Sequence, residues 1–187
     1  MNKNELLDLF KEIGVLKTGH FRLTSGLHSE YYLQCATIFE NPRIAEKIIA
    51  QLQPILPPDV TTVVAPAIGG ITMGYEVARL LGARSIFAER QDGVMTLRRG
   101  FSLSPDEKVL VAEDVVTTGG SVKEVLEIVR FHGCEIVGVT SVVDRSNGKV
   151  DFGVPFYPLI KMEVQTFTQE ECPLCAQNIP ITKPGSR

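Results

Sequence analysis

Short apolar runs alternate with amphipathic segments of helical length between residues 61 and 145, and this alternation restricts the possible folds more than any other feature. The apolar runs are TTVVAPA, RSIFAE, KVLVAED and EIVGVTSVVDR, and the helical segments are GGITMGYEVARLLG and GSVKEVLEIVRFHG. Strands that are apolar along their whole length are buried on both faces, which is typical of parallel sheets covered by helices. We therefore predict an α/β fold with a mainly parallel central sheet flanked by helices.

The segments on either side of this region are predicted to be smaller additions. Apolar residues at helical spacing within 6–13 predict an N-terminal helix, and aromatic and β-branched residues with glycines in 15–36 predict short strands. A second helix is expected at 41–52, a hairpin or other excursion between Glu89 and Lys108, and a return strand with a loose end after Pro155. The chain is thus predicted to be one domain, 1–187, with an N-terminal helix and hood at 1–60, an α/β core at 61–150 and a return strand and tail at 151–187.

The composition excludes several classes of protein. The chain has 44% hydrophobic and 22% charged residues and a net charge of -3, so it lacks the basic excess typical of nucleic-acid binding. No apolar stretch approaches the roughly 20 residues that span a bilayer, and the N-terminal segment contains acids, unlike a signal peptide. We expect a cytoplasmic protein that has neither a nucleic acid nor a membrane as its partner.

The four cysteines fit a reducing compartment. Cys35 and Cys134 lie singly in apolar contexts and are interpreted as buried thiols. Cys172 and Cys175 have a spacing that can hold zinc, but a structural site needs four ligands and the chain shows neither a second Cys pair nor a nearby His. We interpret them as an inert or redox-labile pair, with a zinc shared between subunits as the alternative. No role is assigned to the three scattered histidines, His20, His28 and His132.

The stretch VLVAEDVVTTGGSV, residues 109–122, places polar groups at the carboxyl end of a predicted parallel strand, where open α/β sheets bind ligands. Free N–H groups at the start of the next helix form an anion site. Phosphate alone does not favour two adjacent carboxylates, so a ligand with hydroxyl donors, a cation, or both is expected beside Glu113 and Asp114. A phosphorylated sugar meets both requirements. In the alternative interpretation the glycines only end a turn and the acids cap the helix.

The order of apolar strand, two acids, two apolar residues and TTGGS resembles the phosphoribosyl-diphosphate (PRPP) signature of the type I phosphoribosyltransferases. The resemblance implies that the acids hold the ribose hydroxyls and steady a cationic ring as the catalytic pair. The whole stretch would bind PRPP, with the 5′-phosphate on its second half: Glu113, Asp114, Val115, Val116, Thr117, Thr118, Gly119, Gly120 and Ser121. A second turn would cradle the diphosphate with backbone N–H groups: Ala67, Ile68, Gly69 and Gly70. Close packing of a helix on a strand is the alternative explanation of those two glycines.

Further stretches resemble the orotate branch of this family, so that the likeness covers nearly the whole chain. They are Ser-Gly-x-x-Ser-x-Tyr at 25–31, APAIGGITMG, and VVDRSNG, which carries Arg145. The resemblance implies that Arg145 and Thr117 contact orotate, that orotidine 5′-monophosphate and pyrophosphate are formed, that Mg²⁺ rides on the diphosphate, and that the enzyme is a homodimer. A planar carboxylate suits the bidentate guanidinium, although an exposed pair of Asp144 and Arg145 is the ordinary alternative.

The chain departs from that pattern in two places. The region AERQDGVMTLRRGF lacks the Lys and His of the family's mobile loop, and Thr24 stands where a Lys is expected. From charge alone we expect Arg90, and after it Arg98 and Arg99, to meet the diphosphate; a solvated hairpin is the alternative. These departures leave two other functions open, a non-catalytic PRPP-sensing regulator and a transferase for a purine or another base.

Overall fold

The computed structural model describes residues 1–23 and 25–184, which form two compact units. The larger unit comprises Phe39–Met162, and the smaller one combines Met1–Ile38 with the C-terminal segment that begins at Glu163. Thr24, where a family lysine was expected, lies outside the described residues.

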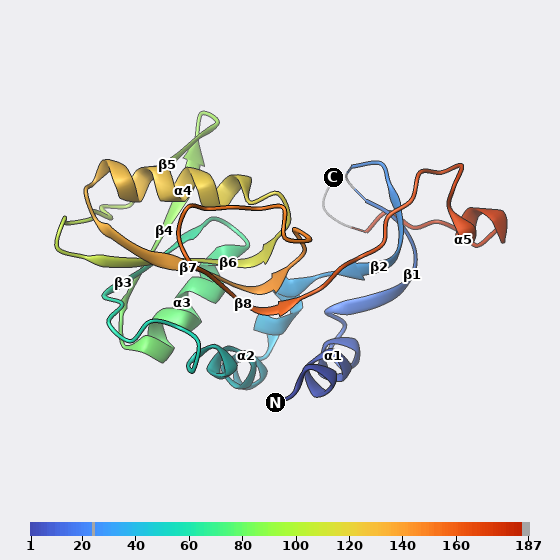
Figure 1. Ribbon diagram of the computed structural model, residues 1–187, viewed down its shortest axis with the longest axis horizontal. Helices are drawn as coiled ribbons and strands as arrows, with labels where there is room; N and C mark the ends of the chain where they lie inside the picture. The colour runs from blue at the N-terminus through green and yellow to red at the C-terminus, as the bar shows by residue number, and fades with distance from the viewer. Residues whose placement is uncertain (24, 185–187) are drawn as a thin grey trace. The chain divides into compact units, whose positions relative to one another are not determined.

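The larger unit is built on a six-stranded sheet (Figure 1). Its strands are β3 (Thr62–Pro66), β4 (Arg84–Gln91), β5 (Val94–Leu97), β6 (Lys108–Val116), β7 (Glu135–Asp144) and β8 (Phe156–Lys161). The spatial order is β5-β4-β3-β6-β7-β8, and every neighbouring pair is parallel except β4 and β5. The predicted α/β fold with a mainly parallel sheet is confirmed, and the predicted excursion after Glu89 is the β4–β5 hairpin.

Two crossover helices cover opposite faces of this sheet because their connections run in opposite directions. The connection through α3 (Gly70–Leu81) leads from β3 to β4, and that through α4 (Gly120–Phe131) leads from β6 to β7. Right-handed crossovers that step in opposite directions place their helices on opposite faces, as Figure 1 shows. Helix α2 (Pro42–Ile49), extended by the 3-10 turn η2 (Ala50–Leu52), packs against α3. The order of the strands therefore reverses between β3 and β6, which are adjacent and parallel: later strands are added outward from each of them in opposite directions.

The core explains why the central strands are apolar throughout. All five residues of β3 are buried, and Val109 to Ala112 of β6 have no exposed surface. Helix α4 presents a stripe at helical spacing to the sheet: Val122, Val125, Leu126 and Val129. Both faces of these strands are thus covered, as the continuous apolar runs predicted.

One strand boundary differs from the prediction. The third apolar run was expected to end in the two acids, but β6 continues past Glu113 and Asp114 to Val116. The extension forms because β7 continues beside it: Glu113 pairs with Ser141 and Val116 with Asp144. The acids therefore lie in regular sheet, where the ladder fixes the direction of each side chain.

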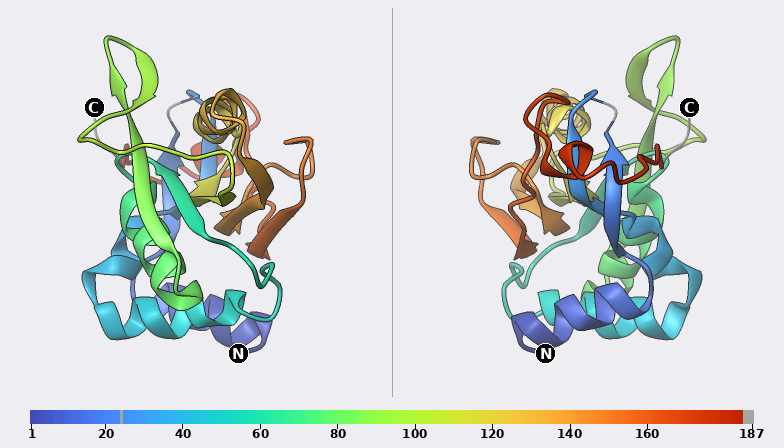
Figure 2. Two further views of the ribbon diagram at one scale, coloured as in Figure 1. Left: turned by 90° about the vertical axis from the view of Figure 1, so that its left-hand side faces the viewer. Right: turned by 90° about the vertical axis from the view of Figure 1, so that its right-hand side faces the viewer.

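The smaller unit consists of a helix, a hairpin and the C-terminal segment. Helix α1 (Lys3–Glu12) begins with a capping box between Asn2 and Glu5, and β1 (Leu16–Arg22) pairs antiparallel with β2 (His28–Leu33), after which the 3-10 helix η1 (Cys35–Glu40) begins. The C-terminal segment, with the short helix α5 (Pro173–Ala176), runs beside this hairpin (Figure 2). The prediction of a loose end is wrong, because bridges join Phe21 to Thr182 and His28 to Phe167.

Candidate functional site

The turns that follow β3 and β6 lie side by side at the point where the strand order reverses. A Cβ atom added to Gly69 would lie 3.4 Å from Asp114 Oδ1, and one added to Gly70 would lie 3.0 Å from Glu113 Oε1. Glycines at these positions let the β3 turn approach the two acids closely. Such a switch point, outside the carboxyl ends of parallel strands, is where open α/β sheets bind ligands. The two separate stretches predicted to bind one ligand are therefore brought together.

The turn after β3 exposes its backbone at the start of α3. A cis peptide bond joins Ala67 to Ile68, and the Ile68 side chain is 86% exposed. Gly69 is the N-cap of α3, and no side chain bonds to this end of the helix. The first N–H groups of a helix lack partners within the helix, so this turn can bind an anion.

The turn after β6 requires glycine at one position for two independent reasons. Gly119 has φ of +72°, a conformation that L side chains rarely adopt. A Cβ atom there would also lie 2.8 Å from the Phe152 ring and 2.9 Å from Val150 Cγ1. Gly119 caps α4 without a side-chain hydrogen bond, so the N–H groups at the start of this helix are also available to an anion.

The loop encloses a small polar pocket of about 80 Å³. Val122 lines it, together with most of the residues predicted to bind PRPP. These are Glu113, Val115, Val116, Thr117, Thr118, Gly119, Gly120 and Ser121. Asp114 does not line it, and its Oδ1 accepts a hydrogen bond of 2.7 Å from the N–H of Val115. Neighbouring residues of one strand point to opposite faces, so the two acids present their carboxyl groups to different parts of the site.

Both acids have a pKa above the usual range in this structure. Burial, and after it the neighbouring charge of Asp114, together raise the pKa of Glu113 from 4.5 to about 8. Burial also raises the pKa of Asp114, against the lowering effect of the Val115 N–H bond. A hydroxyl donor or a positive charge beside these groups would stabilise their ionised form. The pair is therefore poised to interact with a polyhydroxylated or cationic ligand.

Arg145 lies at the same edge of the sheet as the loop. It follows directly after β7, and its N–H donates a hydrogen bond of 2.8 Å to the Val116 carbonyl at the end of β6. The preceding Asp144 is buried and accepts a hydrogen bond from the Ser146 N–H, so its carboxylate serves the turn. The predicted contact of Arg145 with orotate stays a prediction.

The three arginines expected to meet the diphosphate are each engaged by an acid. Arg90 donates two hydrogen bonds to Glu124, 2.8 and 2.7 Å long, and a third to the Gly93 carbonyl. Arg98 and Arg99 both pair with Glu89. The charge reasoning from the sequence did not foresee these pairings, since Arg90 and Glu124 are 34 positions apart. Binding a diphosphate to Arg90 requires that Glu124 release it.

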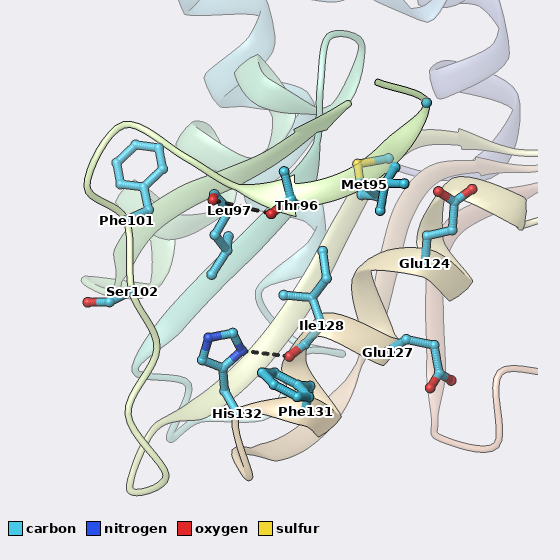
Figure 3. A pocket seen from close by; sticks show the side chains of 12 residues that line it. Met95, Thr96, Leu97, Phe101, Ser102, Glu124, Glu127, Ile128, Phe131 and His132 are labelled. Atoms are coloured by element: carbon cyan, nitrogen blue, oxygen red, sulfur yellow. Dashed lines mark hydrogen bonds between the residues drawn. The ribbon is translucent and has the colours of Figure 1, made fainter. Parts of the chain in front are cut away.

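A larger pocket of about 840 Å³ lies between the β4–β5 hairpin and α4 (Figure 3). Its walls are mostly apolar and include Val94 and Phe131, which are 67% and 88% exposed, with Glu124 and Glu127 at one side. None of residues 113–121 lines it. Because size alone does not supply carboxyl, hydroxyl and N–H groups, we place the functional site at the small polar pocket.

The cysteines follow the sequence prediction only in part. Cys35 and Cys134 are buried thiols, as predicted. The expectation that no histidine lies near the other pair is wrong, because the fold brings His20 and His28 to Cys172 and Cys175. His20 and Cys172 are 152 positions apart, so no spacing rule could have connected them.

Comparisons with known proteins agree with this geometry. A family model of the phosphoribosyl transferase domain matches residues 29–173. The orotate phosphoribosyltransferase of Caldanaerobacter subterraneus subsp. tengcongensis is 54% identical over 188 residues, covering 100% of this chain and 99% of that protein. The chain belongs to the orotate phosphoribosyltransferase family. The member of this family from Thermotoga maritima is also 54% identical, covering 96% of the chain and 97% of that protein.

Solved structures of orotate phosphoribosyltransferases share the fold. The enzyme from Aeropyrum pernix superimposes with a TM-score of 0.73 at 21% identity, covering 84% of this chain and 93% of that one. The enzyme from Mycobacterium tuberculosis gives 0.67 at 24% identity, with 84% and 94% covered. In the described part of the chain, no helix is both long and apolar enough to cross a membrane.

Proposed function

We propose that this chain transfers the 5-phosphoribosyl group of PRPP to orotate, forming orotidine 5′-monophosphate and pyrophosphate in pyrimidine biosynthesis. The observation that carries the proposal is the pair of half-buried acids directly beside a glycine-rich helix start, at the switch point of the sheet. The relatives that align over the full length of the chain bear the name of this activity. The acids suit the ribose hydroxyls, and the helix start suits the 5′-phosphate.

Catalysis would come from charge stabilisation and positioning. As the bond between ribose C1 and the diphosphate breaks, the sugar ring gains positive charge. Glu113 and Asp114 are destabilised as anions when the site is empty, so they interact more favourably with the developing cation than with neutral PRPP. Thr117 to Ser121 would hold the phosphate while orotate approaches the opposite face of C1.

The diphosphate would lie against the β3 turn, where Ile68 to Gly70 offer backbone N–H groups. The N–H of Ala67, which was also expected to contribute, instead donates a hydrogen bond of 2.7 Å to the Ala88 carbonyl. Magnesium would accompany it and neutralise its charge, and we propose that its ligands come mainly from PRPP. In support, the one cluster of three or more His, Cys, Asp or Glu side chains in the described part of the chain consists of His and Cys, which are not the hard oxygen ligands that Mg²⁺ prefers. Arg145 would pair with the orotate carboxylate through its planar guanidinium, and Thr117 would face the same base. We further propose a homodimer that acts in the cytoplasm, on the family resemblance alone.

One assay tests the function and its alternatives. Protein, PRPP and magnesium are mixed with orotate, uracil, hypoxanthine or xanthine, and nucleotide formation is followed by chromatography. We expect turnover of orotate only, its loss when magnesium is omitted, and a raised KM for orotate but not for PRPP in Arg145→Lys. Turnover of a purine would assign the chain to another base, and PRPP binding without any turnover would identify a regulator.

The ion pair between Arg90 and Glu124 predicts opposite effects on PRPP binding for substitutions of its two members. If Arg90 meets the diphosphate, Arg90→Gln should weaken PRPP binding about tenfold, the loss of one charged contact of ~1.4 kcal/mol. Glu124→Gln should tighten binding, because it frees the guanidinium. Calorimetric titration with PRPP measures both. The control is Arg79→Gln, which removes an arginine in the last turn of α3 that pairs with Glu46 and Glu76. Unchanged affinity in Arg90→Gln would remove this residue from the site.

A further inference from the structure

A cluster of two histidines and two cysteines in the smaller unit takes no part in the proposed transfer reaction. The histidines come from the two strands of the hairpin and the cysteines from the turn that forms α5. Their ligand atoms all lie within 4.8 Å of one another, and all but the half-buried Cys175 are buried. We propose that a single zinc ion is bound by these four side chains: His20, His28, Cys172 and Cys175.

The distances between the ligand atoms fit a tetrahedron around one ion. His20 Nε2 lies 3.1 Å from His28 Nδ1 and 3.5 Å from Cys172 Sγ, and Cys175 Sγ lies 3.2 Å from His28 Nδ1 and 3.7 Å from His20 Nε2. Zinc bonds of ~2.3 Å to sulfur and ~2.05 Å to nitrogen place tetrahedral ligands about 3.3 Å apart for two nitrogens and about 3.6 Å apart for nitrogen and sulfur. The observed separations scatter around these values, so the side chains need little movement to bind zinc.

A hydrogen bond outside the cluster orients one of the histidines as a ligand. His20 Nδ1 lies 2.7 Å from the carbonyl oxygen of Ile179, which can only accept. The proton of the neutral ring is therefore on Nδ1, and Nε2 points its lone pair toward the other three groups. A ligand histidine that donates its second nitrogen to a carbonyl is a common arrangement in metal sites.

An irregularity in the hairpin turns His20 toward this cluster. The pairing of β1 with β2 shifts register between Thr18 and Phe21, so β1 contains one extra residue there. His20 and Phe21 are consecutive and both are buried, and the extra residue interrupts the regular alternation of side chains between the two faces of the hairpin. Bulges of this kind redirect a side chain at the expense of ladder pairing.

Backbone hydrogen bonds on both sides of α5 place the cysteines opposite the histidines. His28 exchanges two bonds with Phe167, and the Thr182 N–H donates to the His20 carbonyl. Cys172 and Cys175 are three positions apart in a helical turn, a spacing that puts both sulfurs on one side. A zinc ion would therefore fasten the C-terminal segment to the hairpin that precedes it by more than a hundred residues.

The chemistry of the four ligands identifies the class of site. Two thiolates neutralise the charge of Zn²⁺, which lowers the desolvation cost of burying the ion, and two imidazoles complete the coordination. Four protein ligands leave no open position for substrate, so the site is structural. The competing states are a metal-free cluster of thiols hydrogen-bonded to imidazoles and a redox-active cysteine pair. This inference is independent of the transfer reaction, since its tests measure metal and spectra.

Metal content of the purified protein is the first test. The full chain, carrying a streptavidin-binding tag and grown with added zinc, should contain about one zinc per chain by mass spectrometry. Cys172→Ser with Cys175→Ser should reduce this at least tenfold. Cys134→Ser is the matched control that keeps its zinc, because serine can still donate to the Ser104 carbonyl that Cys134 contacts at 3.1 Å. Wild type without metal, iron in place of zinc, or a double variant that retains zinc would each overturn the proposal.

Cobalt provides a test that needs no variant to fold. Wild type produced with Co²⁺ in place of zinc should show the intense visible bands of a tetrahedral ion and a sulfur-to-cobalt charge-transfer band. Added zinc should abolish both as it displaces the cobalt. Weak octahedral bands without charge transfer would exclude a site made of these cysteines.

Discussion

Replacing both half-buried acids, Glu113→Gln together with Asp114→Asn, should lower kcat for orotate by about 10²- to 10³-fold, the range for losing a preorganised electrostatic contact to the transition state. Amide oxygens still accept hydrogen bonds from the ribose hydroxyls, so PRPP should continue to bind. Amides cannot neutralise a cationic ring, so the loss should fall on the chemical step. Steady-state rates at saturating PRPP and orotate measure this effect.

The control must change the charge equally without touching the site. Asp92→Asn with Glu127→Gln removes two exposed acids from the same unit and should leave kcat unchanged. If the site variant instead raised the KM for PRPP at constant kcat, the acids would only bind the sugar. An unchanged rate would remove both from the mechanism.

The sheet and its loop were predictable because their signals are local. Apolar runs such as Val109 to Ala112 are long enough to indicate strands buried on both faces, and β3 and β6 are where the runs place them. The need for Gly119 is also visible in the sequence as a glycine before a helix, although its contact with Phe152 is not. Local patterns specify elements because backbone geometry and burial act over a few residues.

The parts that could not be predicted depend on contacts between distant residues. The Arg90 to Glu124 pair and the His20 to Cys172 contact join residues 34 and 152 positions apart. In the sequence, Cys172 and Cys175 have no further metal ligands near them, whereas in the folded chain His20 and His28 lie beside them. The raised pKa of Glu113 likewise follows from how deeply the fold buries it.

That raised pKa should make the stability of the protein depend on pH. In the folded state Glu113 holds its proton up to about pH 8, and in the unfolded state it loses it near 4.5. Between these values unfolding releases a proton, so the free energy of unfolding should fall as pH rises, by at most ~1.4 kcal/mol per pH unit. Asp114, whose pKa is also raised, contributes with the same sign.

Glu113→Gln should remove most of this dependence and should be more stable than wild type at pH 8.5. The reason is that an amide needs no proton to remain neutral when buried. Urea unfolding at intervals from pH 5 to 9 measures the slope, and Glu127→Gln, an exposed acid of the same unit, should keep the slope of wild type. If wild type shows no decline over this range, Glu113 is ionised in the empty protein. The preference of the site for a cation would then have to come from something other than a buried acid.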